Sequence, residues 1–119
     1  MARPRNFAEE TVLAQAAELF ARMGYNGASI DDLLTATGLQ RGSLYKAFGS
    51  KRNLFEKVLA AALVSGWPTR PAAVDLLIVA LKELASDDTP IAGLCRQAIL
   101  ESGTDTAHLL GARLLNHLD

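Results

Sequence analysis

The chain has a single cysteine and no long apolar run. Cys95 cannot form an internal disulfide, and its place on the apolar side of an expected helix indicates a packed core thiol rather than a redox sensor. No apolar stretch approaches the ~18–20 residues that span a bilayer, and the sequence does not start with a charged and then apolar leader. We therefore expect a cytoplasmic protein with no membrane partner.

The residue groupings that enzymes and metalloproteins use are missing as well. The sequence contains no Ser/His/Asp or Cys/His constellation, no glycine-rich phosphate loop and no pair of carboxylates expected on one face. Cys95, His108 and His117 do not have the spacing of metal ligands. We expect no enzymatic activity, no bound metal and no cofactor.

The overall charge is weakly acidic, but one segment has no acidic residue at all. The formal net charge is −1 and the isoelectric point about 6.1, which alone argues against a nucleic-acid partner. Residues 1–52 nevertheless carry a net charge of +2, and the remainder carries −3. Between Leu33 and Phe55 there is no Asp or Glu, whereas four basic residues lie there: Arg41, Lys46, Lys51 and Arg52. A basic segment of this kind attracts phosphate.

Residues 29–51 have the pattern of two short helices separated by a glycine turn. Ser29 and Asp32 have the spacing of a capping box, which satisfies free backbone N–H groups at a helix start. Apolar residues then recur at helical spacing from Ile30 to Thr37. Gly38 is suited to the left-handed conformation that ends a helix. A second helix is expected over 41–48, and this arrangement is typical of a helix-turn-helix.

The second of these helices has a core side and a polar side. Leu44 and Phe48 are four residues apart and are expected to face the core together. The polar side carries groups that can bind phosphates or base edges: Arg41, Ser43, Tyr45 and Lys46. Gly42 is a poor helix former, which is easier to explain if a DNA backbone or base comes close there. For Tyr45 the alternative is a core aromatic side chain.

Lys51 and Arg52 are expected at the start of the next helix, after Ser50. Cations are disfavoured near the N-terminal end of the helix dipole, so a phosphate partner for Lys51 explains its position better than an ordinary solvated charge does. Arg3 and Arg5 lie in a proline-containing tail. They have two interpretations, as minor-groove or phosphate contacts or as part of a solubilising tail.

Residues 6 to about 63 resemble the DNA-binding domain of the TetR (tetracycline-repressor-like) family of transcriptional regulators. The resemblance rests on linked features at fixed offsets, which are Gly24-Tyr25 after an aliphatic helix, the Ser29 cap, Gly38-Leu39, Gly42-x-Leu44-Tyr45-x-x-Phe48 and Ser50-Lys51. Gln40 and Asn53 depart from the family pattern, which usually has Ser or Thr and an acidic residue there, and both weaken local capping. The predicted DNA-binding residues are Ser29, Gln40, Arg41, Gly42, Ser43, Tyr45, Lys46 and Lys51.

The expected fold is all-α, with a three-helix helix-turn-helix DNA-binding domain joined by a fourth helix to a short helical regulatory or dimerisation domain. We place these domains at 6–66 and 67–119, because residues 65–71 contain two prolines and a glycine. The first helix, over 8–23, should pack through Val12, Ala16, Leu19, Phe20 and Met23. The fourth, from residue 51, has a double apolar row wide enough to join two bodies. Further helices are expected over 72–86, 90–102 and 105–118, the last with Leu110, Leu114 and Leu118 in its main stripe and Leu109 and Leu115 outside it.

The second half resembles only the front part of a TetR-family regulatory domain. This implies either a shortened chain or a compact variant, and it leaves a small-molecule inducer doubtful. The chain is 50% hydrophobic with a mean hydropathy of +0.15, so apolar surface should remain for a partner.

The resemblance implies a sequence-specific DNA-binding transcriptional regulator. We take it to be a repressor that binds an inverted-repeat operator in double-stranded DNA as a homodimer, and that is nucleoid-associated when bound; activation stays open. The alternative is a degenerate family member that acts as a protein-interaction module through mixed dimers with a longer relative.

Overall fold

The structure is a computed structural model that describes residues 8–119, and this part of the chain is helical without a strand. The all-α prediction is confirmed. The α-helices are α1 (Glu9–Met23), α2 (Ile30–Thr37), α3 (Arg41–Phe48), α4 (Lys51–Ala62), α5 (Pro71–Glu83), α6 (Thr89–Ser102) and α7 (Thr106–Leu115). Short 3-10 turns follow α4 and α7, at Trp67–Thr69 and Asn116–Leu118. The proposed roles of Arg3 and Arg5, and the predicted domain start at residue 6, lie outside the described residues.

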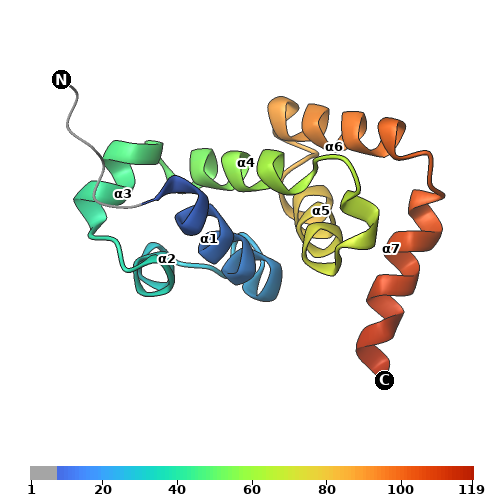
Figure 1. Ribbon diagram of the computed structural model, residues 1–119, viewed down its shortest axis with the longest axis horizontal. Helices are drawn as coiled ribbons and strands as arrows, with labels where there is room; N and C mark the ends of the chain where they lie inside the picture. The colour runs from blue at the N-terminus through green and yellow to red at the C-terminus, as the bar shows by residue number, and fades with distance from the viewer. Residues whose placement is uncertain (1–7) are drawn as a thin grey trace.

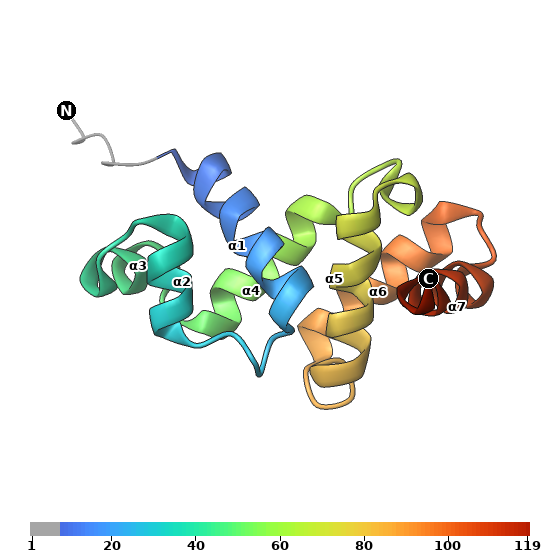
Figure 2. The ribbon, with the colours of Figure 1, turned by 90° about the horizontal axis from the view of Figure 1, so that it is seen from below.

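The molecule is elongated, and its two ends are made by different helices. Its longest dimension is 47 Å, with α3 at one end and α7 at the other (Figure 1). Helices α4 and α5 lie between these ends in both views (Figures 1 and 2). No helix within residues 8–119 is long and apolar enough to cross a membrane.

Local chemistry sets the bounds of α2 and α3 as the sequence predicts. The Ser29 hydroxyl accepts a hydrogen bond from the Asp32 backbone N–H at 2.9 Å, and the Asp32 carboxylate accepts one from the Ser29 N–H at 3.0 Å. These two bonds complete the capping box and lower the pKa of Asp32. Gly38 ends α2 in the left-handed conformation, with φ of 73°. Helix α3 then begins at Arg41, as expected.

One expected core residue of α1 is exposed instead. Val12, Ala16, Leu19 and Phe20 are buried as predicted, but Met23 is 41% exposed, so its assignment to the core was wrong. The reason is the turn after α1. The Tyr25 ring lies with its centroid 6.0 Å from that of Phe20 and 5.3 Å from that of Phe55. An aromatic side chain from the turn therefore continues the buried stripe in place of Met23.

Helices α4 and α5 connect the two halves through one apolar core. The double row of α4 is buried through Leu54, Phe55, Val58 and Leu59, and α4 contacts α1, α5 and α6. Helix α5 is buried on most sides, as its apolar run predicts, and it contacts α1 as well as α6 and α7. It ends at Glu83, earlier than the predicted residue 86. The predicted division at residue 66 stays a prediction.

The proline-rich junction is ordered around the only tryptophan. Trp67 is 3% exposed, and its indole N–H donates a hydrogen bond to the carbonyl oxygen of Ala98 in α6 at 3.2 Å. Cys95, also in α6, is 1% exposed, and burial raises the pKa of its thiol to about 11. The interpretation of Cys95 as a packed core thiol is confirmed.

Helix α7 packs through a different side than its sequence stripe suggests. Leu109 and Leu110 are half-buried against the core, whereas Leu114 and Leu118 are 52% and 82% exposed. The expectation that Leu109 lies outside the packing side was therefore wrong. The Arg113 guanidinium donates two hydrogen bonds of 2.8 Å to the Asp75 carboxylate of α5, so this side of α7 faces α5. Leu109 lies one helical turn before Arg113, on the same side.

Candidate nucleic-acid interface

The exposed side of α3 presents a continuous polar surface at one end of the molecule. Leu44 and Phe48 are buried, at 0% and 5% exposure, and hold this helix on the core. Tyr45 is 41% exposed, so the alternative that its ring belongs to the core does not apply. The other side chains predicted to contact DNA from α3 are exposed too, namely Arg41, Ser43 and Lys46.

Two of the predicted residues differ in what they do at helix starts. Ser29 is the N-cap of α2, and its hydroxyl is engaged with the Asp32 N–H. Gln40 is the N-cap of α3 but makes no side-chain capping bond, as its departure from the family pattern predicts. The free N–H groups at the start of α3 are therefore available to an acceptor such as a phosphate oxygen.

Gly42 lies in open space on the same surface. A Cβ atom added there would meet no heavy atom within 4 Å, and the residue does not have a positive φ. Neither packing nor backbone conformation in residues 8–119 requires glycine at this position. The absence of a side chain leaves room for a close approach to the backbone of α3.

Arg41 is held by a carboxylate of the neighbouring helix. Its guanidinium lies 2.6 Å from the Asp31 carboxylate of α2, and the two side chains are 54% and 82% exposed. Exposed pairs of this kind contribute about 0–1 kcal/mol, so a phosphate or a guanine edge can displace Asp31 at little cost. The ion pair orients the Arg41 side chain and leaves it able to bind DNA.

The two cations at the start of α4 have different surroundings. The Lys51 ammonium lies 4.4 Å from the centroid of the Tyr25 ring, and desolvation lowers its pKa. Arg52 instead donates two hydrogen bonds of 2.7 Å to the Asp88 carboxylate, at the start of α6, and also pairs with Glu56. Arg52 is therefore committed to a contact between the halves, whereas Lys51 is half-buried beside an aromatic ring.

Two acidic residues that were not predicted as functional connect the second half to this region, Glu83 and Asp88. Asp88 caps α6, since its carboxylate accepts the Ile91 N–H at 3.1 Å. Asp followed by Thr89-Pro90 is a signal for a helix start, and it could have been recognised. Glu83 stands at the last residue of α5, where a carboxylate is disfavoured by the helix dipole. That misfit was the available clue to a specific partner.

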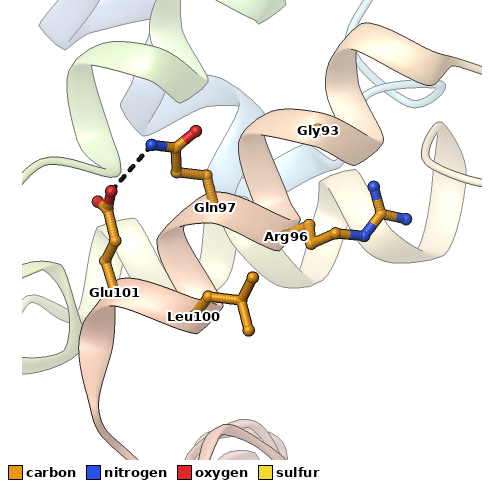
Figure 3. A pocket seen from close by; sticks show the side chains of 5 residues that line it. All are labelled: Gly93, Arg96, Gln97, Leu100 and Glu101. Atoms are coloured by element: carbon orange, nitrogen blue, oxygen red, sulfur yellow. Dashed lines mark hydrogen bonds between the residues drawn. The ribbon is translucent and has the colours of Figure 1, made fainter.

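Two surface hollows are candidates for a small-molecule site. One of about 310 Å³ is lined by residues of α6 alone, Gly93, Arg96, Gln97, Leu100 and Glu101, with a Gln97 to Glu101 hydrogen bond of 2.8 Å across it (Figure 3). The other, of about 250 Å³, lies against α5 and α7 and includes Val74 and Leu109 in its lining. The hollow lined by α6 alone cannot enclose a ligand. The expectation that an inducer is doubtful stays a prediction.

Within residues 8–119, no cluster of His, Cys, Asp or Glu could hold a metal ion.

The region that contains α1 to α4 matches a known family. Residues 12–58 match the model of bacterial regulatory proteins of the tetR family. The uncharacterized HTH-type transcriptional regulator YezE of Bacillus subtilis is 46% identical over 55 residues, which is 46% of this chain and 28% of that protein. The HTH-type transcriptional repressor BdcR of Escherichia coli is 32% identical over 99 residues, which is 83% of this chain and 44% of that protein. The HTH-type transcriptional repressor ComR of Escherichia coli is 40% identical over 57 residues, which is 48% of this chain and 27% of that protein.

These matches identify residues 12–58 as a TetR-family helix-turn-helix domain. The chain spans less than half of the length of these relatives, between 27% and 44%. The similarity to BdcR extends over most of this chain, and so beyond the helix-turn-helix. The relatives are named as transcriptional regulators rather than enzymes.

Proposed function

We propose that this protein is a sequence-specific DNA-binding transcriptional regulator, and that it acts as a repressor. The observation that carries the proposal is the exposed polar side of α3, held on a TetR-family helix-turn-helix by the buried Leu44 and Phe48. Arg41, Ser43 and Lys46 present hydrogen-bond donors there, and Gly42 leaves room for close approach. Two of the relatives, BdcR and ComR, are named as repressors.

The proposal assigns two kinds of contact to this surface. Lys46 and Arg41 read base edges in the major groove, while Tyr45 and Lys51 contact phosphates on either side. Ser29 and Gln40 lie at the starts of α2 and α3, where backbone N–H groups can face the phosphate backbone.

We further propose that two copies bind an inverted-repeat operator. One short recognition helix contacts too little of a duplex to select a site, and a two-fold pair places two such helices about 34 Å apart, in successive major grooves. The exposed leucines of α7 and of the end of α6 are the surface we assign to the homodimer. Under this proposal, the predicted first domain, 6–66, reads DNA and the predicted second domain, 67–119, forms the dimer.

A mobility-shift titration tests DNA binding directly. The duplexes are the promoter region upstream of the protein's own gene and a scrambled sequence of equal length, at several salt concentrations. Lys46→Ala should reduce the preference for the operator by about 1–3 kcal/mol, whereas Lys51→Ala should weaken binding to both duplexes about equally. Equal affinity of the parent protein for both duplexes, or an affinity that does not fall with salt, would contradict the proposal.

A second candidate function is a protein-interaction module that forms mixed dimers with a longer relative. The exposed Leu100, Leu115 and Leu118, at 76%, 65% and 82%, favour it, because such leucines usually meet a partner. Under this proposal the chain alone binds no duplex specifically, and it lowers operator binding by the longer protein. Titrating the chain into a complex of a longer relative with its operator distinguishes the two candidates.

A further inference from the structure

The start of α4 carries two adjacent cations in an electrostatically unfavourable place. Lys51 and Arg52 occupy the first positions of α4, where the helix dipole disfavours positive charge. Arg52 is compensated by Asp88 and Glu56. The Lys51 ammonium makes no ion pair shorter than 4 Å with residues 8–119, and it lies over the face of the Tyr25 ring, 4.4 Å from the ring centroid. The position of Lys51 therefore depends on the position of that ring.

The Tyr25 ring is placed by the turn between α1 and α2. Its edge-on contact with Phe55 and its stacked contact with Phe20 fix one side of the ring. The backbone of the turn is fixed from another element, because the Glu83 carboxylate accepts the Tyr25 N–H at 3.3 Å and the Asn26 N–H at 2.8 Å. Those two N–H groups follow the end of α1 and have no helical partner of their own.

The turn has a conformation that accommodates Glu83. Gly24 has φ of 79° and ψ of 176°, a backbone region that is essentially restricted to glycine. A Cβ atom at this position would come within 2.8 Å of a Glu83 carboxylate oxygen. Glycine at residue 24 therefore permits both the turn and the close approach of the carboxylate.

Glu83 gains these bonds at a place where its charge is otherwise unfavourable. It is the last residue of α5, where the free carbonyl groups of the helix repel a carboxylate. The two backbone N–H groups of the turn, and the positive charge of Lys51 nearby, offset that repulsion. These two bonds join residues that are 58 and 57 positions apart in the sequence, and they connect α5 to the helix-turn-helix.

We propose that Glu83 is a positioning residue for DNA binding, which holds the turn at Tyr25 and Asn26 so that the Tyr25 ring supports Lys51 for a phosphate contact. The proposal rests on the function proposed above. Glu83 itself touches no DNA. It reduces the conformational freedom that Lys51 loses when the ammonium binds a phosphate, and so strengthens a contact made from α4. Arg52 remains with Asp88, so Lys51 is the cation of this pair that binds DNA.

The test uses the full chain and the duplex that the mobility-shift titration identifies as its operator. Glu83→Gln keeps the size of the side chain but removes the charge. Asp87→Asn is the matched control, because it removes one negative charge from the exposed turn that follows α5, four residues after Glu83. We expect Glu83→Gln to weaken binding to operator and scrambled duplexes equally, and Asp87→Asn to leave both unchanged.

Two readouts separate positioning from a general loss of structure. The plot of log affinity against log salt should become less steep by about 0.9 for each subunit when Lys51 loses its phosphate. In a Lys51→Ala background, Glu83→Gln should then have no further effect, because the contact that it supports is already absent. Tyr25→Leu, which removes the ring and leaves Glu83 unchanged, should show the same two effects, and it replaces Glu83→Gln if that variant does not fold.

The experiment distinguishes a failure of the role of Glu83 from a failure of the proposed function. A parent protein that binds no duplex specifically overturns the proposed function, and this inference with it. If the parent binds but Glu83→Gln binds as tightly, the role of Glu83 is wrong. It is equally wrong if Glu83→Gln weakens binding as much in the Lys51→Ala background as in the parent.

Discussion

The Arg41 guanidinium and the Asp31 carboxylate form an ion pair of 2.6 Å within the helix-turn-helix, between the first turn of α2 and the first turn of α3. A carboxylate thus lies beside a cation that we assign to base reading. Its negative charge repels phosphate, and its bond must be exchanged when Arg41 binds DNA.

Asp31→Asn should increase affinity for operator and scrambled duplexes alike. The gain should be about fivefold at most, because the pair is exposed and worth no more than about 1 kcal/mol. It should shrink as salt is raised, since salt screens the repulsion. The mobility-shift titration measures it, with Asp87→Asn, in the turn after α5, as the charge-matched control outside the helix-turn-helix. Tighter binding to the operator alone would show that Asp31 selects sequence, which is a different role.

Asp88→Asn should reduce stability above pH 4 and should flatten the dependence of stability on acid. The hydrogen bonds from Arg52 hold the pKa of Asp88 below its ordinary range. A depressed folded-state pKa contributes stability that is present above the unfolded value, near 3.9, and lost as the pH falls through the folded value. Asn retains an oxygen for the Ile91 N–H, so the cap of α6 survives. Urea unfolding at a series of pH values measures both effects.

Asp105→Asn provides the matched control for that experiment. Asp105 caps α7 in the same way, with its carboxylate accepting the His108 N–H at 3.1 Å, but no described arginine pairs with it. Asp105→Asn should change stability less than Asp88→Asn does. If the two variants lose the same stability, the contribution of Asp88 comes from capping and not from Arg52.

Cys95 should be unreactive in the folded protein. Its thiol is buried and its pKa is raised to about 11, so the nucleophilic thiolate is scarce at neutral pH. A disulfide-exchange reagent should therefore label Cys95 only at the rate at which the protein opens. Fast labelling under native conditions would contradict this prediction.

The buried thiol should also make stability depend on alkaline pH. Because the folded pKa of Cys95 is raised, the free energy of unfolding should decline as the pH rises between about 9 and 11, where the thiol ionises first in the unfolded chain. Comparison with Cys95→Ala isolates this part of the alkaline decline.

Leu114 and Leu118 should be required for self-association but not for folding. Leu114 in α7 and Leu118 in the 3-10 turn after it are both exposed, so changing them together to Glu removes no core contact and introduces charges on the surface that we assign to the dimer. Sedimentation should show a monomer that binds the operator weakly, with an unchanged helical signal. A parent protein that is already monomeric at tens of micromolar would falsify the assignment.

The helix-turn-helix could be predicted almost residue by residue because its bounds depend on neighbours in sequence. The Ser29 to Asp32 capping box and the left-handed Gly38 act within one helical turn, and they fix α2 and the start of α3. The buried row of α4 is predictable in the same way, because helical spacing alone assigns Leu54 and Phe55 to the core.

The errors and omissions concern contacts between residues far apart in sequence. Met23 has the spacing of a core residue, but the Tyr25 ring fills that place through the turn. Arg113 of α7 pairs with Asp75 of α5, a contact that helical periodicity does not encode. Glu83 and the turn at Asn26 are separated by 57 residues. Such pairings arise from the packing of α1 and α7 on α5. The unfavourable place of Glu83 at the end of α5 indicates that it has a partner, but the sequence does not indicate which residue that partner is.

The continuous core from α1 through α5 would also limit how the two halves of the proposed operator can be spaced. Helices α4, α5 and α6 pack on one another between α3 and α7, so the angle at which two copies meet would be passed on to both recognition helices. An operator with one base pair inserted at its centre turns the second half-site away by about a tenth of a helical turn. A rigid dimer could not follow that rotation without losing contacts in one half-site. Its affinity would therefore depend on the spacing between the half-sites as strongly as on their base sequence.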